Sequence, residues 1–367
     1  MSTRYHRLAR ETPAYGWWKL PVAGVLALGL FLGLTIILMG IAFFAFLPVR
    51  GADAFERWID DVGSLDLTKP DFFVLDMLSL AVLIPAVLGA VWIVGPRPIG
   101  YLSSVAGRLR WGWLARNAVM SFLVFGIALV GWVLVAAATD PAEVQAPSGV
   151  DGTVVLAIVL VLLVTPLQAA AEEYVFRGYL LQLVGSWTRF ATIPVLVSVP
   201  LFAAGHTYDW WGLVDVGIFG LTAAILTIRT GGLEAAIAAH TANNVVLFVL
   251  DALGVIVATD ESGAGPVDLV PTALAGIVLV AWVEWSVRRH DVQTTREPIP
   301  PPPPPPAPPV WAPPVYAPAP PPTYVPIRTA PTYVPTAPSS PSAPPGPPPL
   351  HPRTPPYPGE LPPDWDR

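Results

Sequence analysis

Long apolar stretches alternate with short polar stretches over the first 290 residues of the chain. A helix of about 20 apolar residues crosses the roughly 30 Å hydrocarbon core of a bilayer, and a soluble core has no room for many such helices. Eight stretches can be marked, the fourth continuing past Pro166: residues 20–47, 72–94, 117–138, 154–184, 191–206, 213–228, 233–250 and 269–287. The pattern predicts an all-α fold, a polytopic bundle of about eight transmembrane helices.

Composition supports the membrane prediction. Charged residues make up 13% of the chain and hydrophobic residues 53%, whereas a soluble domain carries about 25% charged residues. The chain contains no cysteine, which excludes disulfides, thiolate catalysis and cysteine-ligated metals. No basic cluster is interleaved with aromatic residues, so no nucleic-acid partner is predicted. The lipid bilayer is the expected surrounding.

Charges in the connecting segments predict the topology. Basic connections alternate with acid-dominated ones. The basic segments are the N-terminus, 97–116 and 288–289, and the acid-dominated segments are 53–66, 140–143 and 260–268. Basic residues favour the cytoplasmic side, so eight crossings place both termini of this multi-pass cell-membrane protein in the cytoplasm. The first apolar run is too long for a signal-peptide core and lacks a following cleavage site, so it is predicted to remain as the first span.

The C-terminal part of the chain has a different composition. Residues 298–367 hold 32 of the 46 prolines and cannot form a packed core, so a disordered tail is expected. The sequence Pro-Thr-Tyr-Val-Pro occurs at 322–326 and 331–335, and it allows a second interpretation, docking of domains that bind proline-rich peptides. The predicted organisation is three N-terminal spans, a core of about five spans and the tail: residues 1–150, 151–290 and 291–367.

Charged residues interrupt the fourth apolar stretch, where they are costly and rarely occur without a task. Glu173 and Arg177 are four residues apart, so they share one helix face and can neutralise each other. Glu172 points about 100° away and has no partner in its own helix, so it is free to act as a general base. The alternative is that the three charges only fix the packing of the bundle.

Two further polar groups lie in the fifth and seventh apolar stretches. Phe202 precedes His206 by one helical turn and can pack against its imidazole, although a histidine at a helix end is often only an interface residue. His240 and Asn244 are again four residues apart, and two neutral donors side by side suit the stabilisation of an oxyanion. The alternative for this pair is interhelical hydrogen bonding, which His and Asn commonly provide in membranes.

Together these residues resemble the three motifs of the CPBP family, which comprises CAAX proteases and bacteriocin-processing enzymes and is also called ABI. The resemblance covers about residues 154–287 and shows no departure at the motifs, which are Glu172-Glu173-x-x-x-Arg177, Phe202-x-x-x-His206 and His240-x-x-x-Asn244. It implies an intramembrane glutamic endopeptidase that cuts membrane-embedded or lipidated protein substrates. Glu173, Arg177 and Phe202 are expected to support the site.

The resemblance also implies the catalytic roles. Glu172, together with His206, is expected to activate a water that attacks the scissile carbonyl. His240 and Asn244 are expected to bind the oxyanion. The set contains no Ser or Cys nucleophile, so no acyl-enzyme is expected.

Metal catalysis is an alternative for the same residues. Glu172, His206 and His240 form a ligand set found in catalytic zinc sites, although the chain has no His-Glu-x-x-His motif. We expect catalysis without a cofactor, with a divalent metal such as zinc as the alternative. The alternative function for the whole chain is a non-catalytic membrane scaffold or immunity-type binding protein whose proline-rich tail recruits partners.

The predicted topology contains a conflict of depth. It puts His206 near the outer end of its span, whereas His240 lies about seven residues from the inner end of its own. The motifs can meet only if some spans are broken or tilted, and Pro166, Pro194 and Pro200 are the places where this can happen.

Overall fold

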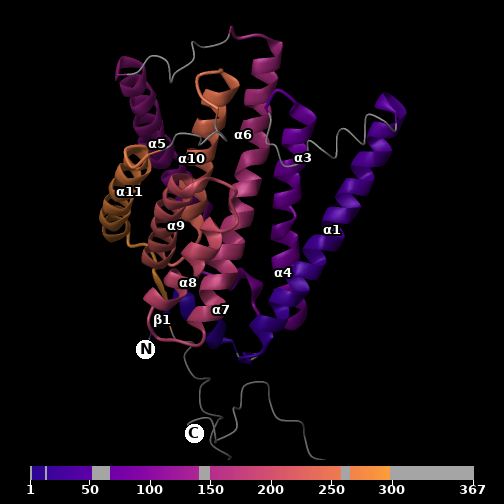
Figure 1. Ribbon diagram of the computed structural model, residues 1–367. Coiled ribbons are helices and arrows are strands. Elements are labelled where there is room, and N and C mark those ends of the chain that lie inside the picture. Colours follow the sequence, from indigo (N-terminus) through magenta and orange to yellow (C-terminus); the bar gives the residue numbers. More distant parts are fainter. Residues whose placement is uncertain (1, 13–14, 52–66, 140–148, 258–264, 298–367) are drawn as a thin grey trace, which may run out of the picture. The chain divides into compact units, whose positions relative to one another are not determined.

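The computed structural model describes residues 2–12, 15–51, 67–139, 149–257 and 265–297. Within them, long helices run side by side as a bundle (Figure 1). The α-helices are α1 (Lys19–Arg50), α3 (Pro70–Ala81), α4 (Leu83–Val94), α5 (Trp111–Thr139), α6 (Gly152–Glu173), α7 (Leu181–Gly185), α8 (Thr192–Ala203), α9 (Trp210–Thr230), α10 (Glu234–Ala252) and α11 (Leu269–Arg289). The short elements are β1 (Thr3–Arg4), η1 (Tyr5–Glu11), η2 (Ile99–Leu102), the π-helix η3 (Tyr174–Leu180) and β2 (Thr295–Arg296).

Seven passes within the described residues are long and apolar enough to cross a bilayer. α3 with α4, and α6 with η3 and α7, each form one pass, while α1, α5, α9, α10 and α11 form the others. Exposed side chains on these helices, such as Ile36, Ile127 and Ile277, are large and apolar, as lipid-facing side chains are. The chain is a multi-pass membrane protein, and the predicted all-α bundle is confirmed.

The predicted stretch 191–206 forms a helix that is too short to cross the membrane. α8 has twelve residues, and at 1.5 Å per residue it extends about 18 Å. The backbone N–H of Gly205 bonds to the carbonyl of Phe202, three residues back, which closes the helix in a tight final turn. Within the described residues, seven passes long enough to cross the bilayer and the shorter α8 therefore replace the eight full spans that the sequence predicts.

The two ends of the helical region lie together. β1 and β2 pair antiparallel, with Thr3 opposite Arg296 and Arg4 opposite Thr295. Because β1 precedes α1 and β2 follows α11, an even number of passes must separate them. Seven full spans together with the partial pass of α8 satisfy this condition.

α10 lies inside the bundle, in contact with α5, α6 and α9. Its buried surface is rich in alanine, and Ala235, Ala236, Ala239 and Ala242 are all 0–1% exposed. Small side chains let neighbouring helices approach closely, and close approach stabilises helix association in membranes. The polar residues of α10 are thereby brought next to those of α6.

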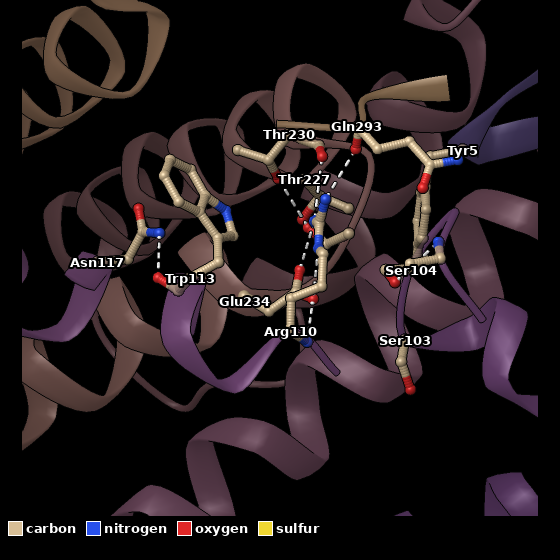
Figure 2. Close-up of polar contacts among 12 residues, drawn as sticks. Tyr5, Ser103, Ser104, Arg110, Trp113, Asn117, Thr227, Thr230, Glu234 and Gln293 are labelled. Carbon is tan, nitrogen blue, oxygen red and sulfur yellow. Dashed lines mark hydrogen bonds and ion pairs between the residues drawn. The ribbon is translucent and has the colours of Figure 1, made fainter. Parts of the chain in front are cut away.

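A partly buried ion pair anchors the start of α10 (Figure 2). Arg110 Nη2 lies 2.7 Å from Glu234 Oε2 and Arg110 Nε lies 2.8 Å from Glu234 Oε1, so the pair is bidentate. The same guanidinium donates to the carbonyls of Thr230 and Gln293. Arg110 thus connects the starts of α5 and α10 with the end of α9 and the segment after α11.

Some predicted features lie outside the described residues. They are most of the acid-rich connections and the proline-rich tail, at 52–66, 140–148, 258–264 and 298–367. Residues Met1–Pro298 group as one unit. The predicted boundary near residue 150 falls within that unit and stays a prediction.

Candidate active site

Glu172 and Glu173 lie at the end of α6, 9% and 0% exposed. Arg177 Nη1 donates to Glu173 Oε1 at 3.0 Å, so the predicted pairing of these two residues is confirmed. Arg177 is fully buried; its Nη2 donates to the carbonyl of Gly220 at 3.1 Å, and its guanidinium carbon lies 4.1 Å from the centre of the Phe202 ring. The buried guanidinium therefore has a carboxylate, a carbonyl and an aromatic face as partners.

The helix changes character directly after the two glutamates. The next seven residues form the π-helix η3, a rare conformation that is frequent at functional sites. It contains Gly178, where a Cβ atom would lie 3.3 Å from the carbonyl oxygen of Leu102. Glycine at this position allows the widened turn to pack closely on the end of η2.

His240 of α10 lies between the two carboxylates. Its Nδ1 is 2.9 Å from Glu173 Oε1, and its Nε2 is 3.6 Å from Glu172 Oε2. The rings of Phe219 and Phe202 flank the imidazole, with centroid distances of 4.9 Å and 5.9 Å. Because an ionised carboxylate can only accept hydrogen bonds, Nδ1 carries a hydrogen when Glu173 is ionised. The other ring nitrogen is thereby directed at Glu172.

Glu172 keeps unused hydrogen-bonding capacity. Its Oε2 is buried and, among the residues that the structure describes, has no hydrogen-bond partner. The 3.6 Å separation from His240 exceeds the length of a hydrogen bond. A buried polar atom without a partner is uncommon in proteins. Glu172 is therefore a group that can bind a water or a substrate.

His206 lies at the edge of this cluster. Its Nδ1 is 3.0 Å from the carbonyl oxygen of Phe202, and its ring contacts those of Phe202 and Tyr208. The predicted contact of Phe202 with the His206 imidazole is thus present. In the described part of the chain no hydrogen bond or ion pair joins His206 to Glu172, and the histidine beside Glu172 is His240. Joint activation of a water by Glu172 and His206 stays a prediction.

Asn244 contacts α6 rather than His240. Its Nδ2 donates to Gln168 Oε1 at 3.2 Å, and its Oδ1 accepts from Asn243 Nδ2 at 3.1 Å. An interhelical hydrogen bond, the alternative left open for this residue, is therefore present. One N–H of the Asn244 amide is left for another acceptor, so binding of an oxyanion also stays a prediction.

The alternative metal site is not pre-formed in this geometry. Among the described residues, no three His, Asp or Glu side chains are arranged to hold a metal ion. His240 directs its Nδ1 at Glu173 and His206 directs its own at a backbone carbonyl, contacts that leave the Nε2 atom of each imidazole available. The metal alternative therefore stays a prediction.

Three residues at the site have no place in the sequence motifs: Gln168, Phe219 and Gly220. Gln168 precedes Glu172 by four residues, so the spacing rule that pairs Glu173 with Arg177 also indicates it. Phe219 and Gly220 come from α9 and meet the site only through the packing of the bundle. No local signal in the sequence indicates them.

A comparison with protein families finds a match over the region that contains this site. Residues 153–246 match the family model described as type II CAAX prenyl endopeptidase, Rce1-like. All seven motif residues lie within that range. This region is therefore similar to the type II CAAX prenyl endopeptidases of the CPBP family. The similarity supports a peptidase at the level of the family, and it agrees with the multi-pass architecture.

A comparison with individual proteins finds a distant relative. The uncharacterized protein YyaK of Bacillus subtilis is 26% identical over 171 residues, which are 45% of this chain and 56% of the relative. The chain thus matches little more than half the length of that relative. No solved structure matches the chain.

Proposed function

We propose that the chain is an intramembrane glutamic endopeptidase in which Glu172 is the general base. The observation that carries the proposal is the position of His240, 2.9 Å from Glu173 and 3.6 Å from Glu172 inside an apolar bundle. A buried carboxylate oxygen without a partner, beside an imidazole, can bind a water and accept its proton.

The balance of charges in the cluster supports this role. Two carboxylates and the Arg177 guanidinium leave one excess negative charge. A protonated His240 brings the sum to zero, and both of its ring nitrogens are then donors, Nδ1 to Glu173 and Nε2 toward the reaction. Such a donor is most effective in a low-dielectric site from which water is largely excluded.

Hydrolysis would proceed without a covalent enzyme intermediate. Glu172 takes a proton from the water, and the water oxygen attacks the scissile carbonyl carbon. The carbonyl oxygen becomes an oxyanion that accepts hydrogen bonds from His240 Nε2 and the Asn244 amide. Glu172 then returns the proton to the amide nitrogen as the carbon–nitrogen bond breaks. His206, at the edge of the cluster, helps to orient the water.

The proposed substrate is a membrane-embedded or lipidated protein. Glu172 and Glu173 belong to the pass Gly152–Gly185, so a scissile bond must enter the helix bundle to reach them. Peptides that partition into the membrane are concentrated at this depth, whereas soluble peptides are not.

We further propose that the chain lies in the cell membrane with both termini in the cytoplasm. The pairing of β1 with β2 puts the N-terminal segment and the segment after α11 on one side. Arginines are concentrated in these segments and in the connections at the same end, and the positive side of a membrane protein faces the cytoplasm. They include Arg4, Arg7, Arg10, Arg97, Arg108, Arg110, Arg288, Arg289 and Arg296.

The proline-rich tail is proposed as a docking segment. Two copies of Pro-Thr-Tyr-Val-Pro, at 322–326 and 331–335, suit aromatic-lined domains that bind polyproline II peptides. This role is separate from catalysis, so removal of the tail should leave peptide hydrolysis in detergent unchanged.

The proposed function is tested by cleavage of a library of membrane peptides in detergent, with and without a chelator. Glu172→Gln keeps the shape of the side chain but cannot act as a base, so cleavage should fall at least about 10²- to 10⁴-fold. Glu284→Gln is the control, because Glu284 pairs with Arg229 and Arg288 on the exposed side of α11. It should cleave as the wild type does.

Each outcome separates the candidate functions. Cleavage that survives chelation and disappears in Glu172→Gln supports glutamic catalysis. Loss of cleavage on chelation would return the metal alternative. A wild type that is folded but cleaves nothing would favour the non-catalytic scaffold.

A further inference from the structure

A second polar contact joins α6 and α10 one helical turn from the proposed catalytic cluster. Asn244 Nδ2 donates to Gln168 Oε1 at 3.2 Å. Gln168 precedes Glu172 by four residues and Asn244 follows His240 by four residues, so each pair shares one helix face. Because α6 and α10 are antiparallel, four residues back from Glu172 on α6 and four residues forward from His240 on α10 lie at the same level. Gln168 and Asn244 therefore extend the seam that Glu172 and His240 form.

Gln168 is not a surface group, since it is only 5% exposed. Directly beyond it the seam becomes apolar, where Val161, Val164, Val245 and Phe248 belong to one buried cluster. A buried amide destabilises the fold unless it forms hydrogen bonds, and a leucine would fill the same space without that penalty. The hydrogen bond to Asn244 is the contact that a leucine could not make.

The hydrogen bonds of Asn244 show what this contact achieves. The Asn244 Oδ1 accepts from Asn243 Nδ2 at 3.1 Å, and one of its two amide hydrogens is directed at Gln168. These two bonds hold both ends of the amide. Its second N–H, fixed in direction, is left for a further acceptor.

We propose that Gln168 is a positioning residue, which orients the Asn244 amide so that its remaining N–H binds the oxygen of the scissile carbonyl. The inference rests on the proposed function, because it requires an oxyanion formed at Glu172. Gln168 itself contacts no reacting atom. A donor stabilises the transition state only if it is already directed to where charge develops, and a misplacement of about 1 Å can lower the rate about 10²-fold.

Gln168→Met tests this role, because methionine keeps the length of the side chain and removes the acceptor. We expect kcat to fall roughly 10- to 100-fold while KM changes little, since the lost interaction belongs to the transition state. Asn244→Ala should lower kcat at least as far. The double variant should behave as Asn244→Ala does, because Gln168 acts only through Asn244.

Gln182→Met is the matched control. Gln182 on α7 is 2% exposed and donates from Nε2 to the carbonyl of Tyr101 at 2.6 Å. This variant also loses a hydrogen bond of a buried glutamine, so its unfolding temperature should fall as that of Gln168→Met does. Its kcat should stay within about twofold of the wild type, because Gln182 does not contact the site residues.

Two results would overturn the inference and leave the proposed function standing. The first is a kcat of Gln168→Met equal to that of the wild type or of Gln182→Met. The second is a double variant whose kcat falls by the product of the separate decreases in Gln168→Met and Asn244→Ala. Both are read with a wild type that cleaves and Glu172→Gln that does not. A wild type without cleavage would overturn the proposed function, and the inference with it.

Discussion

Replacement of Glu173 by glutamine should destabilise the protein strongly although it changes few atoms. Glu173 Oε1 accepts hydrogen bonds from Arg177 at 3.0 Å and from His240 at 2.9 Å. Both Glu173 and Arg177 are fully buried. Glutamine keeps one acceptor oxygen but removes the negative charge, so the buried Arg177 guanidinium loses the carboxylate that it contacts directly.

The size of the effect follows from that burial. Removal of one partner of a buried ion pair costs about 3–5 kcal/mol, because the other charge remains desolvated. With roughly 2 °C per kcal/mol for a large domain, Glu173→Gln should lower the unfolding temperature by about 6–10 °C. Glu173→Gln combined with Arg177→Met should lie closer to the wild type than Glu173→Gln alone, because neither partner of this ion pair is then left buried without the other.

Heat unfolding in detergent, followed by tryptophan fluorescence, measures these shifts. Glu284→Gln is the control, since its ion pair with Arg229 is partly exposed and such pairs are worth about 0–1 kcal/mol. The reasoning is wrong if Glu173→Gln unfolds within about 2 °C of Glu284→Gln. It is also wrong if addition of Arg177→Met lowers the unfolding temperature further.

Two more predictions concern the end of the bundle where the chain termini of the helical region meet. Glu234→Gln removes the counter-ion of Arg110. The loss of unfolding free energy should be at the low end of about 3–5 kcal/mol, because Arg110 keeps two carbonyl partners. An unfolding temperature equal to that of the wild type would contradict this. Gly185→Ala should displace η1, since the added Cβ would lie 2.2 Å from the carbonyl oxygen of His6, and protease should then cut the N-terminal segment faster. Gly217→Ala is its control, because a Cβ there meets no atom within 4 Å and a helical alanine stabilises by up to about 1 kcal/mol; equal protease resistance in the two variants would refute the clash.

The sequence predicts those features that depend on neighbours along the chain. The apolar runs give every membrane pass, because a long apolar helix has few other places to lie. Spacing of four residues gives the Glu173–Arg177 pair and the contact of Phe202 with His206. In each case the partners belong to one helix or one helix end, so the geometry of the helix alone brings them together.

Contacts between helices could not be predicted in the same way. The resemblance assigns water activation to Glu172 with His206, which stays a prediction, and the position of His240 beside Glu172 was not predicted. The choice between two histidines depends on how far one helix is shifted along another, and periodicity carries no information on that shift. The end of α8 was not predicted either, because the predicted stretch runs to residue 206 while the helix stops at Ala203.

Glu173 and His240 lie at one depth because the end of α7 and the start of α10 lie at different depths. Glu173 lies twelve residues before Gly185, the end of α7, which is about 18 Å of helix. His240 lies six residues after Glu234, the start of α10, which is about 9 Å. Because Glu173 and His240 are in contact, α7 extends roughly 9 Å beyond the level at which α10 starts. His206 reaches the same region because α8 is an interrupted pass that ends at Ala203, and the Phe202 ring contacts both His206 and His240.

A loop from outside the family region fixes this step. Ser103 Oγ lies 2.7 Å from the hydroxyl of Tyr174, the residue after Glu173, and the Ser103 carbonyl accepts from the N–H of Leu233 at 2.9 Å. One serine thus holds both the turn after the glutamates and the start of the helix that carries His240. A shift of α10 by one residue would move His240 by about 1.5 Å, enough to break its bond to Glu173. The N-terminal helices therefore do more than anchor the protein, since their connecting loop sets the register on which the proposed catalytic cluster depends.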